Sequence, residues 1–545
     1  MKKGLSIFLA LALGAGLLSG CSGGTGGSSA AADTGDGSTG GLISSDGTAT
    51  LTFATAENND PNNSYTKILP VWEELEKRTG VKVTFEVADQ NQYDEVMGTR
   101  LAAGVGLPDI VRVPGGNPLV YANTGLLIPL SALIDEHAPN IKDLYDNKRP
   151  DVKSVLTAPD GEIYVIDSIV DARSEVNQMG IGVRKDWLAK LGLDEPSNME
   201  DWYQMLKAFK TGDPNGNGKE DEIPLICMPT PNAKTGGYTY GIYKFGTAYG
   251  LHLSVSDGWY ADEDGKVAYE WIDPAMKDYL AEMHRWHSEG LLDVEFSTQT
   301  SDQWTAKAIG DIAGGDVSSM TMQYPQWNTR MQEMIPDARW ESVLPAAAVD
   351  GTRYLERENP TEGIYYGITR DCKDPVMAIK WLDYMYASPE GQILLTNFGV
   401  EGLSYDMVDG KPQLKESILK DERGSGLAME ALGMNGRFPR VLMKEMIEQR
   451  FFQYTDEVTQ AKKTAEFYVP PFPVMLSTDE ETTRFASVMA DINTLRDEYI
   501  LGFITGQKNL DEFEDYVAKV ESMGIAEAIS IKQAQYDRYL EQSAK

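Results

Sequence analysis

Cysteine and histidine are scarce in this chain, which has three cysteines and four histidines among its 545 residues. So few cysteines exclude a disulfide scaffold and a cysteine-rich metal site. So few histidines leave little material for catalysis by histidine. The zinc-protease motif H-E-x-x-H and the phosphate-binding motif G-x-x-x-x-G-K-[ST] are also missing from the sequence. These absences argue against the metalloproteases and nucleotide hydrolases that carry those motifs.

Positive charge is in equally short supply, with 49 lysines and arginines against 83 aspartates and glutamates and a net charge of −34. Proteins that bind nucleic acid need a basic surface, so no nucleic-acid partner is expected. The hydrophobic content of 42% and the charged content of 24% are those of a soluble globular protein. At this length two large domains are expected. The acidic balance leaves the ligand open, because a cleft can differ in charge from the surface around it.

The apolar run from Leu5 to Leu18 is too short and too rich in glycine for a comfortable membrane-spanning helix. It follows Lys2 and Lys3, as in a secretory signal peptide. The run ends in Leu18-Ser-Gly-Cys21, which resembles the lipobox of bacterial lipoproteins. This resemblance implies that residues 1–20 are removed, that Cys21 is lipidated, and that the protein sits on the extracytoplasmic face of the bacterial cell membrane. An ordinary signal peptide with an incidental cysteine is the alternative.

Residues 21–48 contain mostly glycine, serine, threonine, alanine and aspartate, with almost nothing to bury. This composition predicts a flexible tether. A Gly-rich chain of roughly 27 residues has a root-mean-square span of about 30 Å. The globular part is expected to occupy residues 49–545.

The beginning of the globular part alternates short apolar segments with amphipathic ones. Strands are expected at 51–55, 81–87 and 107–111, with helices at about 69–79 and 93–101 between them. Strand, helix, strand, helix, strand is the pattern of a doubly wound α/β fold.

A loop farther along the chain, DPNGNGKEDE at 213–222, carries oxygen-bearing side chains at every second position. Asp213, Asn215 and Asn217 come first, and Asp221 and Glu222 follow. Calcium takes six to eight oxygen ligands, and this alternation supplies most of them. The segment before the loop predicts a helix that is capped by Ser197 and Glu200 and ends at Thr211-Gly212.

The loop matches the first half of an EF-hand, D-x-N-x-N-G, and departs from it at the twelfth position, which is Pro224. Asp221 and Glu222, together with the carbonyl of Lys219, would have to complete the shell. Several carboxylates gathered in ten residues repel one another without a cation, so we expect a structural Ca²⁺. A solvated turn without an ion is the alternative.

Several longer segments resemble the extracellular solute-binding proteins, the ligand-capturing components of ABC importers. The segments are TGVKVTFEV, AAGVGLPDIV and GLLIPL in the first 130 residues, VRKDWLAKLGLDEPSNMEDWYQMLKAFK at 183–210, VMAIKWLDYMYASPEGQILLTNFGVEGLSYD at 376–406, and the C-terminal run 491–540. Together they are similar to the sugar-binding class (family 1), and within it to the larger lipoprotein and alginate-binding-protein branch.

This resemblance implies a two-lobe α/β fold of the periplasmic-binding-protein type II kind, with a ligand cleft between lobes joined by crossover strands. It implies an N-lobe of roughly 49–165 plus part of 366–500, and a C-lobe of roughly 166–365 plus later segments. It also implies a calcium site whose ligands are those of the loop: Asp213, Asn215, Asn217, Lys219 (carbonyl), Asp221 and Glu222.

Seven residues are predicted to contact the ligand, because sugars pack on aromatic rings and hydrogen-bond to polar groups. Asn63 and Tyr65 lie where the first strand ends, and Trp327 lies in the loop-like QYPQWN. Tyr164 and Tyr365 lie on the segments that resemble crossover strands. Glu401 and Tyr405 lie in or beside a G-x-E-G loop like that of the family. For the two crossover tyrosines ordinary strand burial is the alternative.

The predicted function is that of a lipid-anchored, monomeric binding protein that captures an oligosaccharide and delivers it to the permease subunits of an ABC transporter. No enzymatic step is expected. A peptide-binding lipoprotein of an ABC importer is one alternative. A secreted glycoside hydrolase is another, and it would require two carboxylates about 5–10 Å apart across a glycosidic bond.

Overall fold

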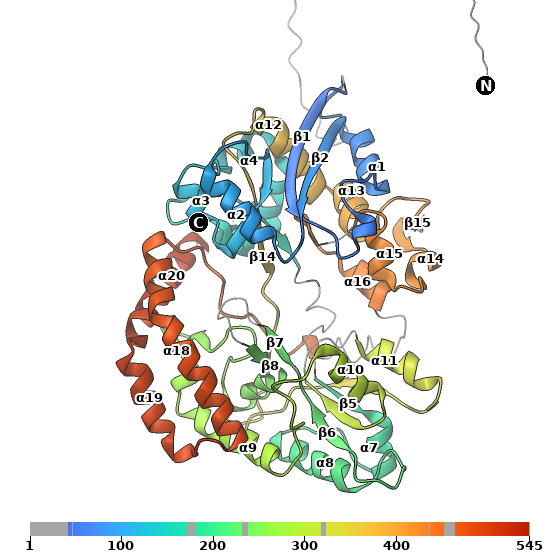
Figure 1. Cartoon of the computed structure of the whole chain (residues 1–545), viewed down its shortest axis with the longest axis vertical. Helices are drawn as coiled ribbons and strands as arrows, with labels where there is room; N and C mark the ends of the chain where they lie inside the picture. The colour runs from blue at the N-terminus through green and yellow to red at the C-terminus, as the bar shows by residue number, and fades with distance from the viewer. Residues whose placement is uncertain are drawn as a thin grey trace, which may run out of the picture. The chain divides into compact units, whose positions relative to one another are not determined.

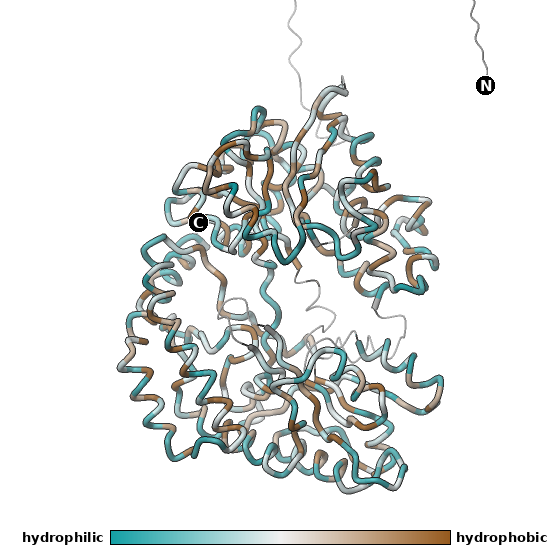
Figure 2. Tube along the Cα trace, viewed as in Figure 1, coloured by the Kyte–Doolittle hydropathy of each residue, from teal (hydrophilic) through white to brown (hydrophobic). Residues whose placement is uncertain are grey.

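The computed structural model describes residues 42–45, 47–170, 172, 181–231, 238–317, 323–434, 436–451 and 464–543. The predicted signal peptide, the lipidation site Cys21 and most of the predicted tether lie outside these residues. Two hydrophobic cores organise the described part of the chain, and we call the parts built on them the first and second lobes. Figure 2 shows hydrophobic residues concentrated in the interior of each lobe.

The first lobe buries residues drawn from 51–172 and from 365–476. Its five-stranded sheet has the order β2-β1-β3-β14-β4. Strand β1 is parallel to β2 and β3, whereas β14 is antiparallel to both β3 and β4. The strands are β1 (Ala49–Ala56), β2 (Val81–Ala88), β3 (Ile110–Arg112), β4 (Ile166–Ile169) and β14 (Thr361–Ile368).

Helices surround this sheet (Figure 1). They are α1 (Pro70–Thr79), α2 (Tyr93–Ala103), α3 (Leu119–Asn123), α4 (Ser131–His137), α5 (Pro139–Asp143), α6 (Pro150–Leu156), α12 (Pro375–Leu382), α14 (Glu416–Leu419), α15 (Ser425–Glu430) and α16 (Lys444–Phe451). Helix α1 begins at a proline, which lacks the N–H that a first helical turn leaves unused, and ends at Gly80 in the left-handed region.

The second lobe buries residues drawn from 181–346 and from 489–528. Its sheet has the order β12-β5-β11-β6 and is also mixed, since only β11 and β6 are parallel. The strands are β5 (Ile181–Arg184), β6 (Ile223–Ile226), β11 (Ala313–Asp316) and β12 (Trp340–Val343). The packed helices are α7 (Lys185–Leu191), α8 (Met199–Thr211), α9 (Ala275–Ser288), α10 (Ser301–Ile309) and α11 (Gln323–Gln332).

Three C-terminal helices complete the second lobe, and α18 packs against both α9 and α20 (Figure 1). They are α18 (Asp479–Thr505), α19 (Phe513–Ser522) and α20 (Ile525–Ser543). Helix α18 starts in a capping box, in which Thr478 Oγ1 accepts from the N–H of Glu481 and Glu481 accepts from the N–H of Thr478. None of the helices in the described ranges is long and apolar enough to cross a membrane.

Two of the segments that link the lobes pair with each other. Strand β13 (Leu355–Glu356) precedes β14 and runs parallel to β17 (Tyr468–Val469), which precedes α18. The side chain of Glu356 is 1% exposed and accepts hydrogen bonds from the turn Ser254–Val255–Ser256 of the second lobe. This buried carboxylate therefore ties the linking segment to one lobe.

Two local predictions need correction. The helix-capping side chain before α8 is Asn198, which accepts from the N–H of Asp201 at 3.0 Å, and not Ser197. The tether was expected to run to residue 48, but Ile43 and Ser44 already donate to the carbonyl of Thr79 at 2.9 and 3.1 Å. A side chain at Gly80 would place its Cβ 1.9 Å from the Ser44 carbonyl, so glycine permits this approach.

Candidate functional site

Polar side chains gather at the edge of the first sheet where its parallel strands end. The loop after β1 supplies Asn59, the loop after β2 supplies Gln90, and Arg112 is the last residue of β3. Strand β14 runs the other way, so its first residues reach the same edge. Open α/β sheets bind their ligands at this edge.

Asn59 links two charged groups from a distant part of the chain. Its Nδ2 donates to Glu430 Oε1, and its Oδ1 accepts from Arg437 Nη2 at 2.9 Å. The same Arg437 nitrogen donates to Gln90 Oε1. The carbonyl of Arg437 accepts from Thr55 Oγ1 at 2.6 Å, which fixes the loop to β1. The segment after α15 is thus held over the ends of β1 and β2.

Arg112 occupies the other half of this edge. Its guanidinium lies over the ring of Tyr93, 5.3 Å from the ring centre, and its carbonyl is 2.8 Å from the Tyr93 hydroxyl. Tyr366 of β14 is the register partner of Arg112. Arg440 forms an ion pair with Glu362, and both side chains are largely buried.

Five side chains at this edge have a buried polar atom with no hydrogen-bond partner among the described residues. Buried polar groups of proteins are nearly always bonded, and leaving one unbonded costs about 1–3 kcal/mol. Such a concentration makes this edge the candidate ligand site. We call the set the strand-end cluster: Tyr65 (Oη), Arg112 (Nη1), Tyr366 (Oη), Glu430 (Oε2) and Arg440 (Nε).

An aromatic layer lies beneath the strand-end cluster. The ring of Tyr65 meets that of Phe438 edge to face at 4.7 Å, and Trp72 packs on Phe85 at 4.6 Å. Burial raises the pKa of Tyr65 well above its usual value, and the nearby Arg437 opposes this effect. Tyr65 therefore stays a neutral hydroxyl that can donate to a ligand oxygen.

Asp167 of β4 is the buried carboxylate beside this edge. It accepts from the backbone N–H groups of Gly363 at 2.9 Å, Ile364 at 3.2 Å and Ser168 at 2.6 Å. The pairing of β14 with β4 is irregular here, between Thr361 and Tyr365, which frees those N–H groups. Burial raises the pKa of Asp167 to about 7, against the lowering effect of the Gly363 bond.

Of the seven predicted contact residues, the structure brings three to this edge or beside it. Tyr65 is a member of the strand-end cluster. Asn63 lies in the loop after β1, where its carbonyl accepts from Asn58 Nδ2 at 2.5 Å. Tyr365 precedes Tyr366 on β14 and is 3% exposed. Their contact with a ligand stays a prediction.

Three other predicted residues lie elsewhere. Tyr164 is half-buried just before β4, and its hydroxyl donates to Asp160 at 2.8 Å. Glu401 is exposed in a turn that bridges to Tyr405, whose ring contacts Phe398 at 5.9 Å. Burial raises the pKa of Tyr405, and charges on α1 contribute to the shift. These two residues therefore lie beside α1.

Trp327 was expected in a loop, and it lies in α11 instead. Its ring is 3% exposed and packs against Trp304 at 5.0 Å and Trp340 at 5.4 Å. The segment QYPQWN was misjudged because its proline stands in the first turn of a helix, where the missing N–H costs nothing. A ligand contact at Trp327 stays a prediction.

The loop 213–222 folds its own oxygens inward. The N–H of Gly218 bonds the Asp213 carboxylate at 3.1 Å, and the N–H of Lys219 bonds Asn217 Oδ1 at 2.7 Å. Asn217 Nδ2 lies 3.0 and 3.2 Å from the two oxygens of Asp221. Gly216 and Gly218 both have positive φ, at 72°, which the sharp turn requires.

The electrostatics of the loop suit a cation. Burial, with the charges of Asp221 and Asp213 adding to it, raises the pKa of Glu222, whose Oε1 is buried without a hydrogen-bond partner. No three His, Cys, Asp or Glu side chains in the described ranges are gathered closely enough to hold a metal by themselves. A cation here would therefore depend on amide and carbonyl oxygens as well, and Asn215, Asn217 and Lys219 can supply them.

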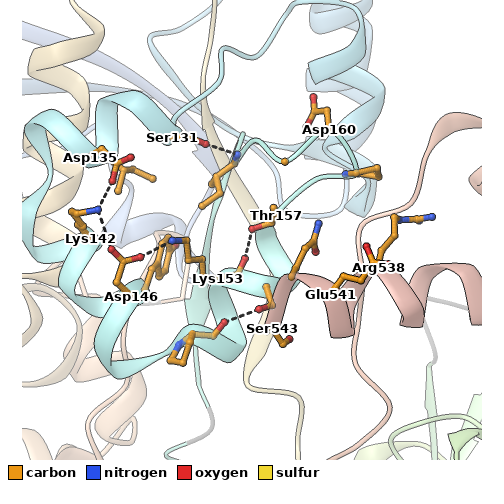
Figure 3. A pocket seen from close by; sticks show the side chains of 18 residues that line it. Ser131, Asp135, Lys142, Asp146, Lys153, Thr157, Asp160, Arg538, Glu541 and Ser543 are labelled. Atoms are coloured by element: carbon orange, nitrogen blue, oxygen red, sulfur yellow. Dashed lines mark hydrogen bonds and ion pairs between the residues drawn. The ribbon is translucent and has the colours of Figure 1, made fainter. Parts of the chain in front are cut away.

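A separate pocket of about 810 Å³ lies between the helices α4 to α6 and the end of α20. Figure 3 shows Lys142 between Asp135 and Asp146, with Lys153 on the other side of Asp146. Arg538, also on its wall, pairs with Glu481. Because its cations are already paired with carboxylates, we assign no ligand to this pocket.

Two mixed α/β lobes, one with a polar edge above an aromatic layer, form the described part of the chain. Residues 59–393 match the model of the bacterial extracellular solute-binding protein family. That match covers more than half of the chain, so the chain belongs to this family. Membership confirms the expectation of a binding protein and not an enzyme.

Relatives match along most of their length. FusA, the fructooligosaccharide ABC transporter substrate-binding protein of Streptococcus pneumoniae, is 28% identical over 531 residues, 90% of each chain. Lipoprotein LipO of Bacillus subtilis is 25% identical over 81% of this chain and 84% of LipO. The crystal structure of alginate-binding protein AlgQ2 without calcium ion has a TM-score of 0.71 at 25% identity, covering 91% of this chain and 99% of AlgQ2. The expected two-lobe type II fold is thereby confirmed.

Most of the strand-end cluster escaped the sequence analysis. Arg112 carried a usable signal, because a charged residue ends the apolar strand IVR immediately before Val-Pro-Gly-Gly. Glu430, Arg437 and Arg440 carried none. They lie in a stretch without a motif. Only the fold brings Glu430 and Arg437 to Asn59, more than 300 residues earlier in the sequence, and Arg440 to Glu362.

Proposed function

We propose that this protein is a lipid-anchored receptor that captures an oligosaccharide outside the cell and delivers it to the permease subunits of an ABC importer. The observation that carries the proposal is the strand-end cluster of the first lobe. Family membership and the kinship with FusA, a fructooligosaccharide-binding component of such a transporter, support it.

The chemistry of the cluster suits a sugar. Hydroxyl groups both donate and accept, and the cluster offers donors at Arg112 and Arg440, an acceptor at Glu430, and hydroxyls at Tyr65 and Tyr366. A peptide-binding site would more often offer a strand edge for backbone pairing.

Calorimetric titration of the mature chain with a panel of oligosaccharides tests the proposal. We expect saturable binding and a rise in melting temperature with ligand concentration. Peptides of the same size serve as the matched control. Binding of peptides, with no binding of any sugar in the panel, would overturn the proposal. Release of shorter sugars on long incubation would indicate a hydrolase.

We propose that the loop 213–222 holds a structural Ca²⁺. Asp213, Asn215, Asn217, Asp221 and Glu222 would supply side-chain oxygens, and Lys219 its carbonyl. The ion would be the positive partner of the buried Glu222 Oε1, which has no hydrogen bond among the described residues. It would also fix the loop to the following strand β6. The relative AlgQ2 supports this proposal, because its crystal structure was determined without calcium ion, which implies that calcium matters to that protein.

Elemental analysis and thermal unfolding with and without a chelator test the calcium proposal. We expect about one calcium per chain and a lower melting temperature after chelation. An unchanged unfolding curve with no bound metal would refute it.

We propose that Cys21 is the lipidated first residue of the mature protein and places it on the extracytoplasmic face of the cell membrane. The lipobox-like sequence supports this, as does kinship with the lipoprotein LipO. Membrane fractionation of the natural chain beside a Cys21→Ser variant tests it. The variant is expected in the soluble fraction, and equal membrane retention would contradict the proposal.

A further inference from the structure

Arg112 is a cation at the candidate site without an acidic partner. No carboxylate in the described part of the chain forms an ion pair with it, although the sequence has 83 acidic residues against 49 basic ones. Its guanidinium is held in place by the Tyr93 ring, and its Nη1 is buried with no hydrogen-bond partner. A buried, positioned donor of this kind is costly unless something bonds it.

A second guanidinium lies close by. Arg437 reaches over the strand ends to the amide oxygens of Asn59 and Gln90. Burial lowers the pKa of Arg437, and the charge of Arg112 lowers it further. The two arginines therefore repel each other across the same edge of the sheet.

Three carboxylates near this edge bond to groups other than Arg112. Glu362 is paired with Arg440, and Glu430 accepts from Asn59. Glu57 accepts from the N–H of Asn58 at 2.8 Å and from Ser64 Oγ at 2.6 Å. None of these bonds reaches Arg112, whose buried Nη1 stays without a hydrogen-bond partner among the described residues.

We infer that the ligand carries a carboxylate, as in an oligosaccharide that contains a uronic acid, and that Arg112 together with Arg437 holds this group. The inference rests on the proposed function and adds a ligand class to it. A guanidinium fork matches the geometry of a carboxylate, which accepts two parallel hydrogen bonds. An anion between the two arginines would also cancel their repulsion, which a neutral sugar hydroxyl cannot do.

Calorimetry on the mature chain provides the test. The probes are trimers of galacturonate, glucuronate and mannuronate, the methyl ester of each, and the neutral trisaccharide kestose. We expect at least one uronate to bind roughly 10- to 100-fold more tightly than its own methyl ester, the size expected for charge-assisted bonds. The affinity for the uronate should also fall as salt rises, because ion pairs are screened.

Variants assign the effect to Arg112. Arg112→Gln should bind the uronate and its ester about equally, and Arg112→Lys should keep part of the preference. Arg423→Gln is the matched control, since that exposed arginine of the first lobe already has its own partner in Asp421. It should leave the preference unchanged.

The outcomes separate this inference from the proposed function. Tight binding of kestose, or of ester and acid alike, overturns the carboxylate inference and leaves an oligosaccharide receptor. A preference for the acid that survives in Arg112→Gln overturns the assignment to Arg112. The comparison of acid with ester in the natural chain remains decisive even if a variant fails to fold. If none of these sugars binds, the inference is overturned. If peptides bind instead, the proposed function is overturned too.

Discussion

The strand-end cluster and the loop 213–222 concentrate polar groups by opposite means. The loop draws its oxygens from ten consecutive residues, and most of them already bond one another. The cluster draws its groups from segments as far apart as residues 65 and 440, and each keeps a buried atom without a bond. The polar groups of a local motif can hydrogen-bond to one another when the motif folds. A site assembled from distant segments can retain polar atoms that are free to bond a ligand.

The two regions also differ in how they treat a carboxylate. In the loop, the Asn217 amide lowers the pKa of Asp221. Beside the cluster, burial raises the pKa of Asp167 to about 7. At Asp221 the loop thus stabilises negative charge in solvent, whereas at Asp167 the first lobe penalises it in the interior.

The largest effect is expected at the cluster itself. Glu430→Ala removes an acceptor and leaves Asn59 without its partner, so sugar affinity should fall roughly 100-fold, the order of a lost bond to a charged group. Calorimetry measures the change. Glu416→Ala is the control, since Glu416 is an exposed residue of the same lobe paired with Lys420. An equal loss in both variants would mean that Glu430 has no special role.

A substitution in the loop should change the melting temperature of the protein and leave its affinity for sugar nearly unchanged. Asp213→Ala is expected to abolish the effect of chelator on the melting temperature, an effect worth about 2.7 kcal/mol when free calcium is 100 times its dissociation constant. Sugar affinity well below the melting temperature should change less than threefold. Differential scanning calorimetry with and without calcium measures the first effect. A large loss of affinity would break the contrast between the two regions.

Asp167 should make stability fall as pH rises. Its folded pKa is raised above that of the unfolded chain, so its contribution is complete below about pH 4 and is lost as pH rises through about 7. Between pH 5 and 7 the free energy of unfolding should decrease by about 2 kcal/mol more in the natural chain than in Asp167→Asn. Denaturant titration at both pH values measures this. An equal change in the free energy of unfolding with pH in both proteins would contradict the raised pKa of Asp167.

The smallest effect is expected inside the loop. Asn217→Ala removes hydrogen bonds to Asp221 that are exposed to water, so in the presence of chelator the free energy of unfolding should change by less than about 1 kcal/mol. With calcium present the same variant should be clearly less stable, because it also removes a ligand of the ion. Equal effects under both conditions would indicate a simple turn.

Periodicity and local motifs predicted much of the first lobe. The strands expected at 51–55 and 81–87 are β1 and β2, and the helix expected at 69–79 is α1. These elements follow from apolar spacing within a few residues, which the sequence displays directly. Arg437 and Glu430 were invisible because their role depends on contacts with Asn59, which no local pattern encodes. Trp327 was misplaced because the tendency of proline to mark a loop outweighed its suitability for a first helical turn.

The docking of Ile43 and Ser44 on Thr79 has a mechanical consequence. It secures the chain at the end of α1, beside the amino end of β2, before the chain enters β1. The strand-end cluster lies at the opposite end of β1, which at about 3.3 Å per residue is roughly 25 Å away. If Cys21 is lipidated as we propose, a pull on the chain would act on the edge of the first lobe opposite the strand-end cluster. The proposed anchor and the proposed sugar site would then be at opposite ends of β1, so a force at one end would not act directly on the other.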